Sequence, residues 1–177
     1  MEKPLLVSTF GFPGSGKTFF TSQLAKEKGY IHLNADAVRQ MLFPKPAFTL
    51  DESKRVFAFM DTAAEYLLKI GHSVIYDSNT TKRAHRSGAP ELARRSGANH
   101  VLVWIKTPEA LARQRLKERK PGQSRFELPV SDEVFERMRD AAEPPADDER
   151  PVILPGDIPF AKQLDIFEKL AFSDRAA

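Results

Sequence analysis

A glycine-rich segment from Gly11 to Thr18 has the residue types and spacing of a phosphate-binding loop. Its letters GFPGSGKT match the pattern G-x-x-x-x-G-K-[ST] at every fixed position and directly follow a buried-strand pattern. Such a backbone points its N–H groups inward, where they and the positive end of the next helix bind polyphosphate. Glycine-rich turns also serve plain packing, whereas a dinucleotide-binding loop would need the spacing G-x-G-x-x-G. The motif predicts a nucleoside triphosphate site built from Gly11, Pro13, Gly14, Ser15, Gly16, Lys17 and Thr18.

The last two residues of this loop carry its chemistry. A lysine at this position bridges the β- and γ-phosphates, and the hydroxyl that follows it binds Mg²⁺. We therefore expect Lys17 to be catalytic and Thr18 to be a magnesium ligand.

Asp36 and Arg39 follow the second predicted strand and lie one helical turn apart on the same face. A carboxylate there can accept a hydroxyl proton during phosphoryl transfer, and a guanidinium can hold a substrate anion through two hydrogen bonds. Both residues are candidates for catalysis and substrate binding. The alternative is that Asp36 only caps the helix and Arg39 pairs with it on the surface.

Asp77 ends the third predicted strand, and Asn79, Lys82 and Arg83 follow it closely. A carboxylate at this position could hold Mg²⁺ or its water shell, or pair with Arg39. We expect Asp77, Asn79 and Arg83 to face the substrate. An aspartate followed by turn residues is also ordinary turn chemistry, so this pattern is weak by itself.

Arg115 and Arg119 are four residues apart, near the end of a predicted helix that leads into a loop rich in Pro, Gly, Gln and Ser. A closing segment that brings guanidinium groups to a transferring phosphoryl group stabilises the transition state. These arginines are candidate nucleotide ligands, and Arg119 is also a candidate catalytic residue. The alternative is an exposed basic helix end that complements the helix dipole.

The elements that must position these residues alternate between apolar runs and longer segments of helical period. This order favours βα units, a mainly parallel sheet and an α/β fold. The predicted strands cover 5–10, 30–34, 73–77, 101–105 and 152–154. The predicted helices cover 17–28, 36–42, 50–70, 82–96, 107 to about 119, 131–142 and 159–172.

The longest predicted helix, 50–70, begins with a capping box formed by Thr49 and Glu52. Its apolar residues recur at helical spacing and predict the buried face: Val56, Phe59, Met60, Ala63, Leu67 and Ile70.

Length and composition limit the class of protein. The chain has 177 residues, which suggests one domain over 1–177 with a lid at about 113–130, and 41% of its residues are hydrophobic. No stretch is long and apolar enough to cross a membrane, so we expect a cytoplasmic protein with no membrane partner. With no cysteine and four scattered histidines, a metal would be oxygen-bound and would arrive with a substrate.

Charge is distributed unevenly along the chain. Residues 81–125 contain 12 Lys or Arg and 3 Glu, whereas residues 126–177 contain 6 basic and 13 acidic residues. A basic sector suits nucleotide phosphates or a nucleic-acid backbone. It is equally compatible with solvated helix faces.

Taken together, these residues resemble the P-loop kinases related to polynucleotide 5′-hydroxyl kinases and zeta-toxin-like kinases. The resemblance rests on the glycine-rich loop, on Asn34-Ala35-Asp36 with Arg39, on Asp77-Ser78-Asn79, on residues 115–119 and on residues 130–144. It implies a P-loop NTPase-type three-layer sandwich with five parallel strands and a helical lid. It also implies that Asp36 is the general base, Arg39 binds the acceptor's phosphate and Arg119 contacts the phosphates of ATP.

The resemblance implies ATP and Mg²⁺ as cofactors and transfer of a phosphoryl group to an alcohol. The acceptor that we expect first is the 5′-hydroxyl of a polynucleotide. A small-molecule O-kinase of the same fold is the alternative, and a non-catalytic nucleotide-binding protein ranks below both. The sequence indicates no protein partner.

Overall fold

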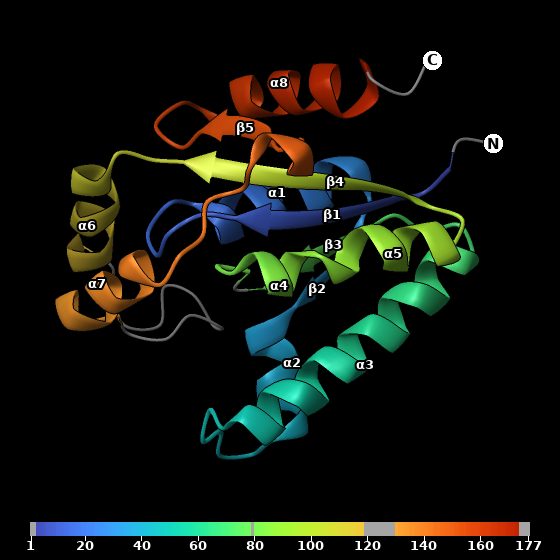
Figure 1. Cartoon of the computed structure of the whole chain (residues 1–177). Helices are drawn as coiled ribbons and strands as arrows, with labels where there is room; N and C mark the ends of the chain where they lie inside the picture. Colours follow the sequence, from blue (N-terminus) through green and yellow to red (C-terminus); the bar gives the residue numbers. More distant parts are fainter. Residues whose placement is uncertain (1–2, 79, 119–129, 174–177) are drawn as a thin grey trace.

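The computed structural model describes residues 3–78, 80–118 and 130–173. Its helices and strands follow one another along the chain as shown in Figure 1: β1 (Leu5–Phe10), α1 (Lys17–Lys28), β2 (Ile31–Asn34), α2 (Ala35–Leu42), α3 (Leu50–Lys69), β3 (Val74–Asp77), α4 (Arg83–Arg86), α5 (Gly88–Arg95), β4 (Asn99–Lys106), α6 (Glu109–Glu118), α7 (Asp132–Asp140), a 3-10 turn (Asp147–Glu149), β5 (Val152–Pro155) and α8 (Phe160–Ser173). The predicted α/β fold is confirmed.

The strands form one parallel sheet in the order β2-β3-β1-β4-β5. All carboxyl ends therefore lie at the same edge of the sheet, and the arrowheads of β1 and β4 point towards α6 and α7 in Figure 1. Open parallel sheets bind their ligands at this edge. The predicted site residues lie at the end of β3 or in the segments that follow β1, β2, β3 and β4.

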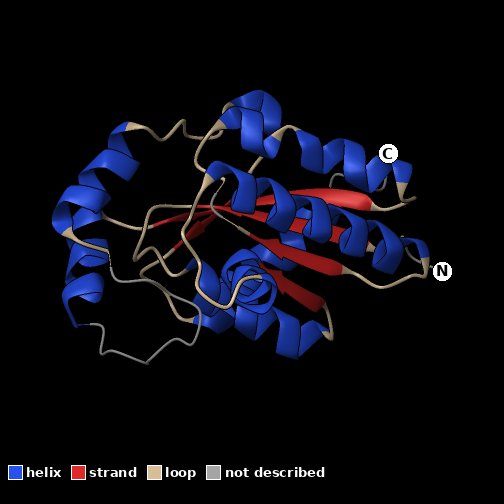
Figure 2. Ribbon diagram, turned by 90° about the horizontal axis from the view of Figure 1, so that it is seen from below, coloured by secondary structure: helices blue, strands red, loops and turns tan. Residues whose placement is uncertain are grey.

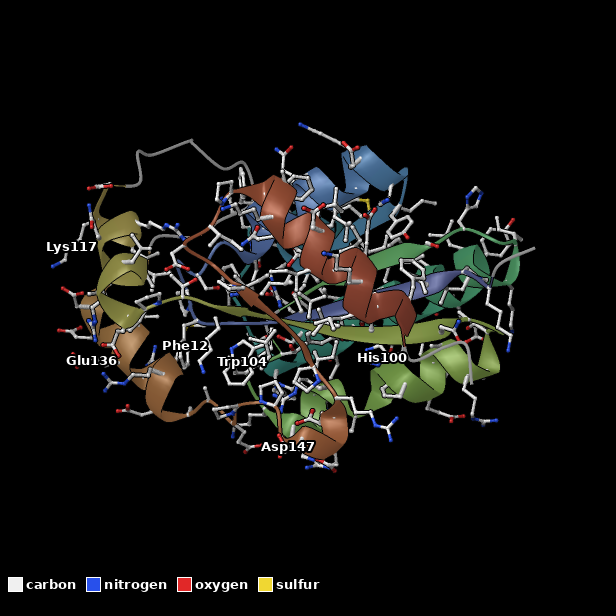
Figure 3. All side chains as sticks on the ribbon, turned by 90° about the horizontal axis from the view of Figure 1, so that it is seen from above. Phe12, His100, Trp104, Lys117, Glu136 and Asp147 are labelled. Atoms are coloured by element: carbon white, nitrogen blue, oxygen red, sulfur yellow. The ribbon has the colours of Figure 1, made fainter. Side chains whose placement is uncertain are left out.

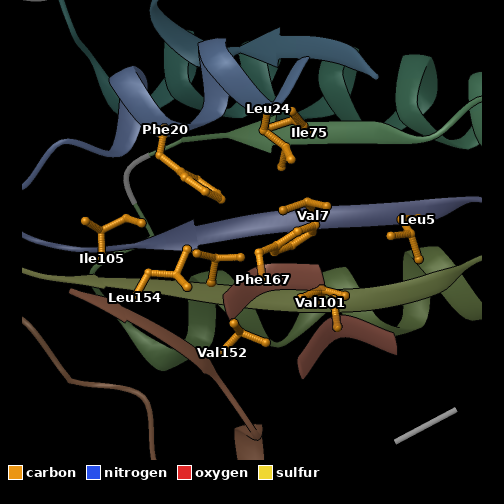
Figure 4. Close-up of a cluster of buried hydrophobic side chains, with 12 residues drawn as sticks. Leu5, Val7, Phe20, Leu24, Ile75, Val101, Ile105, Val152, Leu154 and Phe167 are labelled. Atoms are coloured by element: carbon orange, nitrogen blue, oxygen red, sulfur yellow. The ribbon is translucent and has the colours of Figure 1, made fainter. Parts of the chain in front are cut away.

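Helices cover both faces of the sheet and produce three layers (Figure 2). On one face, α1 and α8 pack Phe20, Leu24 and Phe167 against residues of β1, β3, β4 and β5 (Figure 4). On the other face, α2, α3 and α5 pack against Leu6, Val74 and Tyr76. Strands covered on both faces read as continuous apolar runs, which explains why the sequence pattern located them well.

Two expectations about the helices were wrong in detail. The segment predicted as one helix over 82–96 is divided into α4 and α5, because Pro90 has no N–H to donate to the carbonyl of residue 86. In α3 the buried stripe is Val56, Met60, Ala64 and Leu68, whereas Phe59 and Ile70 are 41% and 52% exposed. The periodicity is compatible with either stripe, and the sheet contacts only one of them.

No helix in the described part of the chain is long and apolar enough to span a membrane.

We expect the α1–α8 face to contribute strongly to stability. Phe167 on α8 is fully buried, so Phe167→Ala should lower the free energy of unfolding by about 3–5 kcal/mol through lost burial and a residual cavity. Phe172→Ala on the same helix is the control, because Phe172 is 39% exposed and its truncation should cost much less. Urea unfolding of both variants measures the difference, and equal losses would contradict the packing described above.

Candidate functional site

The phosphate loop joins the carboxyl end of β1 to the first turn of α1. Gly14 and Gly16 have φ angles of 77° and 99°, which side-chain-bearing residues rarely adopt. A Cβ on Gly14 would also lie 2.3 Å from the carbonyl oxygen of Ala112, so the loop packs directly against α6. Glycine at this position is therefore needed for two reasons, the backbone angle and the close approach.

The amino end of α1 is suited to an anion. Its N-cap is Gly16, which supplies no side-chain acceptor to the first-turn N–H groups. Lys17 Nζ donates to the carbonyl oxygens of Gly11 at 2.6 Å and Phe12 at 3.0 Å, which holds the ammonium over the loop. Thr18 follows in the same turn. The arrangement offers backbone donors, a cation and a hydroxyl to one polyphosphate.

Asp77 lies at the end of β3 and is 4% exposed. Its Oδ2 accepts hydrogen bonds from Thr21 Oγ1 on α1 at 3.1 Å, His32 Nε2 on β2 at 2.9 Å and Asn34 Nδ2 at 3.0 Å. Burial raises the pKa of Asp77, but the hydrogen bonds from His32 and Asn34 and electrostatic interactions with His32 and Lys17 outweigh it and lower the pKa overall. The carboxylate is therefore ionised at neutral pH.

Asn34 connects this carboxylate to α2. Its Oδ1 accepts from the N–H of Ala37 and caps the helix, while its Nδ2 binds Asp77. The N-cap that the alternative interpretation gave to Asp36 thus belongs to Asn34. Asp36 lies half-buried in the first turn of α2, at the carboxyl edge of the sheet.

Arg39 is only 7% exposed and points towards the start of α3. Its Nη2 donates to Ser53 Oγ at 3.2 Å, its Nη1 lies 3.5 Å from Glu52 Oε2, and its guanidinium lies 5.0 Å from the ring centre of Phe48. Among the described residues, its Nε and Nη1 have no hydrogen-bond partner. Arg39 is therefore a buried cation that its neighbours hold in place, with N–H groups that still lack hydrogen-bond partners. The alternative in which Arg39 lies on the surface is excluded.

Glu52 holds the loop that carries Phe48. The carboxylate accepts from the backbone N–H groups of Ala47 and Phe48, and these bonds and the charge of Arg39 lower the pKa of Glu52 despite its desolvation. Phe48 has a φ of 55°, a strained value for a residue with a side chain. The strained loop keeps an aromatic ring over Arg39.

The two described arginines of α6 have different surroundings. Arg115 Nη1 lies 3.7 Å from the position that a Cβ on Gly16 would take, so this side chain reaches the phosphate loop. Arg113 forms ion pairs with Glu109, Asp132 and Glu136, and its guanidinium lies 4.3 Å from the ring centre of Phe135. Arg113 joins α6 to α7, whereas Arg115 lies beside the phosphate loop. Arg119 lies outside the described residues and stays a prediction.

Aromatic side chains connect the phosphate loop to α7 and to the sheet. The ring of Phe12 contacts Phe135 of α7 and Phe10 of β1, and Phe10 contacts Trp104. Figure 3 shows Phe12 near the α6–α7 pair and Trp104 at the neighbouring end of the sheet. Trp104 thus packs against Phe10, at the end of β1 that leads into the phosphate loop.

The remaining predicted ligands lie elsewhere or outside the described residues. Arg83 is bound to Asp148, and its backbone N–H donates to Glu143. The contacts around Asp77 in the described part of the chain do not include Arg83. Asn79 is not among the described residues.

His32 and Glu52 organise the site, and sequence reasoning gave neither of them a place in it. His32 lies inside a short strand, and the sequence shows it only as one of four scattered histidines. It reaches Asp77 because β2 pairs with β3. Glu52 was recognised as a capping residue, and its contact with Arg39 depends on how α2 packs on α3. A polar residue within an apolar strand was the one available signal for His32.

Comparison with known proteins shows which family and which structures the chain is similar to. A family model described as an AAA domain matches residues 6–145. A curated protein of Acanthamoeba polyphaga mimivirus, whose name describes a bifunctional polynucleotide phosphatase/kinase, is 29% identical over 113 residues, which are 63% of this chain and 23% of the relative. The match thus spans less than a quarter of that protein.

Solved structures share the fold across nearly the whole chain. A sugar kinase from Janibacter sp. HTCC2649 has a TM-score of 0.69 at 18% identity and covers 99% of this chain and 96% of its own. A gluconokinase from Sinorhizobium meliloti 1021 has a TM-score of 0.67 at 22% identity, with 100% and 95% covered. A chain of the Pnkp1/Rnl/Hen1 RNA repair complex has a TM-score of 0.67 at 20% identity. This match covers 80% of the present chain and 44% of that chain. The fold is that of P-loop kinases.

The hydrogen bonds to Asp77 should make stability depend on pH in acid. Because the folded-state pKa of Asp77 is lowered, its contribution is complete above the unfolded value, near 3.8, and is lost as the pH falls through the folded value. We expect Asp77→Asn to destabilise the protein by about 1–3 kcal/mol at pH 7. The difference from wild type should shrink below pH 3.8. Urea unfolding at several pH values tests this, and a constant difference down to the lowest pH would contradict it.

Proposed function

The chain belongs to the AAA domain family, and we propose that it is an ATP-dependent kinase that transfers the γ-phosphoryl group to an alcohol. The observation that carries this proposal is the phosphate loop itself. Its two left-handed glycines, the uncapped start of α1, Lys17 and Arg115 surround one place for a polyphosphate. The kinase fold of the structural neighbours supports the same reaction.

Magnesium fits the donor set at this loop. Thr18 would offer a hydroxyl oxygen, and Asp77 would offer an ionised carboxylate, both of which are oxygen ligands that Mg²⁺ prefers. Since Oδ2 of Asp77 already accepts three hydrogen bonds, Oδ1 is the oxygen left for the ion or for one of its waters. When bound, the ion neutralises charge on the phosphates.

Asp36 and Arg39 would prepare the acceptor. In our proposal the carboxylate of Asp36 accepts the proton of the acceptor hydroxyl, whose oxygen bonds to the γ-phosphorus as the bond to the leaving ADP breaks. Arg39 would bind the acceptor through its Nε and Nη1, and Glu52 and Ser53 keep its guanidinium in place. Arg115, with Arg119 if it lies alongside, would stabilise charge on the transferring group.

Two acceptor classes have support. The 5′-hydroxyl of a polynucleotide is supported by the name of the mimivirus relative and by the RNA repair complex. A small alcohol is supported by ion pairing in the basic sector, where Arg83, Arg86 and Arg95 are bound to Asp148, Glu149 and Glu65. Paired arginines attract a nucleic-acid backbone weakly, so the geometry favours the small alcohol.

Asp36→Asn should slow transfer strongly while nucleotide binding remains. Loss of the proton acceptor is expected to lower kcat by about 10²–10⁴-fold, with an unchanged Kd for ATP. Labelled-ATP transfer measures the first quantity and nucleotide titration the second. Asp51→Asn on the exposed start of α3 is the control, and Lys17→Ala should weaken ATP binding and transfer together. An unchanged rate in Asp36→Asn would exclude Asp36 as the base.

Salt dependence separates the acceptor classes. For a small neutral acceptor, KM should change less than about 2-fold between about 50 and 200 mM salt, because few counterions are released. For a 5′-hydroxyl oligonucleotide, KM should rise steeply over the same range. Steady-state transfer with each acceptor gives the comparison. A steep rise with efficient oligonucleotide turnover would reverse our preference for the small alcohol.

A further inference from the structure

A cavity of about 260 Å³ lies between α3 and the α4–α5 pair. Phe57 and Asp61 contribute one wall from α3, Ala89 and Leu92 contribute another from α5, and Tyr76 and Ser78 contribute the floor. Its volume is slightly below the range of about 300–1,000 Å³ that is typical of sites for drug-sized molecules. A molecule the size of a single sugar fits this space.

Two elements lead from the candidate site into this cavity. On α3, Ser53, Phe57 and Asp61 are four residues apart and share a face, and Ser53 is the residue that binds Arg39. At the end of β3, Asp77 faces Thr21 of α1, while its neighbours Tyr76 and Ser78 face the opposite side of the sheet and line the cavity. The cavity therefore lies next to the residues that adjoin Asp77 at the end of β3, on the opposite face of the sheet from the Asp77 side chain, and shares a face of α3 with Ser53, the partner of Arg39.

The floor of the cavity contains an unused polar group. Ser78 is 5% exposed, and among the described residues its Oγ has no hydrogen-bond partner. A buried hydroxyl without a partner is costly, and a ligand hydroxyl would satisfy it. Nearby, Tyr76 Oη donates to Asp61 Oδ1 at 2.6 Å. The carboxylate of Asp61 is thereby fixed at the wall, where it can accept further hydrogen bonds.

Charge at the cavity disfavours an anionic ligand. Arg86 and Arg95 line it, but Arg86 is paired with Glu149 at 2.8 Å and Arg95 with Glu65 at 3.1 Å. Asp61 would repel a phosphate or carboxylate placed beside Tyr76. The lining instead combines an aromatic ring, a carboxylate and hydroxyl groups. This combination suits a neutral molecule with several hydroxyl groups.

We propose that this cavity binds the non-reacting part of the acceptor and that the acceptor is a neutral, polyhydroxylated molecule of sugar size. This inference rests on the proposed kinase function, because only a kinase would make the bound molecule an acceptor. Binding of the molecule to the cavity does not itself depend on catalysis. One hydroxyl would extend towards Asp36, and the others would contact Ser78 and Asp61.

The first test fills the cavity. Ala89→Phe places a ring in it, and Ala84→Phe makes the same change at an exposed position of α4. The probes are neutral pentoses, hexoses and polyols, with gluconate and a 5′-hydroxyl hexanucleotide for comparison. We expect at least one neutral probe to raise the thermal midpoint of wild type and of Ala84→Phe. The same probe should bind Ala89→Phe at least about tenfold more weakly, with ATP affinity unchanged.

The second test keeps the proposal falsifiable if Ala89→Phe does not fold. Ser78→Ala removes a hydroxyl that has no protein partner, so the free energy of unfolding should not fall, while affinity for the neutral probe should drop about 2- to 10-fold. A residue with a purely structural role would show the opposite result.

The outcomes separate the two proposals. Sugar binding that is retained in Lys17→Ala and lost in Ala89→Phe, without transfer from ATP, would support the cavity and reject the kinase function. Transfer with a KM that Ala89→Phe and Ser78→Ala leave unchanged would support the kinase function and overturn the cavity proposal. Binding of gluconate or the hexanucleotide alone, with no neutral probe bound, would also overturn it.

Discussion

The hydrogen bonds to Asp77 determine how the two halves of the candidate site are placed. Thr21 brings in α1, which carries Lys17 and Thr18, and Asn34 brings in α2, which carries Asp36. One buried carboxylate oxygen therefore connects the phosphate loop to the proposed base through two short contacts. An ionised carboxylate in the interior is costly without hydrogen-bond donors. The charge of Asp77 therefore requires the three donors to stay in place, and the donors in turn stabilise the charge. A substitution that removes one of these hydrogen-bond donors should therefore lower the stability of the fold. It should also change the distance between the phosphate loop and Asp36.

Electrostatics elsewhere act mainly to hold segments together. The acidic turn Asp147–Glu149 is bound to α4 through Arg83 and Arg86, and Figure 3 shows Asp147 beside that helix. Arg86 is 2% exposed, donates to the carbonyls of Thr80 and Thr81 and lies over Phe10, so its pair with Glu149 is a buried one. Breaking such a pair leaves an uncompensated charge, whereas exposed pairs contribute little. Arg83 and Arg86 are therefore already paired within the fold, which weakens the value of the basic sector as an indicator of nucleic-acid binding.

Sequence reasoning located the strands and the phosphate loop because both depend on local chemistry: apolar runs and a motif with fixed glycines. Long-range packing determined what it missed. Which residues of α3 are buried depends on where the sheet lies. Phe59 and Met60 are both apolar, so the sequence alone does not distinguish the exposed Phe59 from the buried Met60. The break between α4 and α5 could have been predicted from Pro90. The partners of Arg39 could not, since Glu52 and Ser53 reach it only through the contact of α2 with α3. His32 lies far from Asp77 in sequence and meets it through the β2–β3 register.

Packing between the phosphate loop and α6 limits how the predicted lid can move. The backbone of Gly14 touches Ala112, Phe12 touches Phe135, and Arg113 ties α6 to α7 through Asp132 and Glu136. A rotation of α6 away from the loop would break the close Gly14 contact and expose Ala112, which is almost fully buried. The described part of α6, α7 and the loop therefore form one packed unit in which Arg115 is already beside Gly16. Nucleotide would meet a preassembled cation at this point, so its binding energy need not be used to bring Arg115 in from solvent.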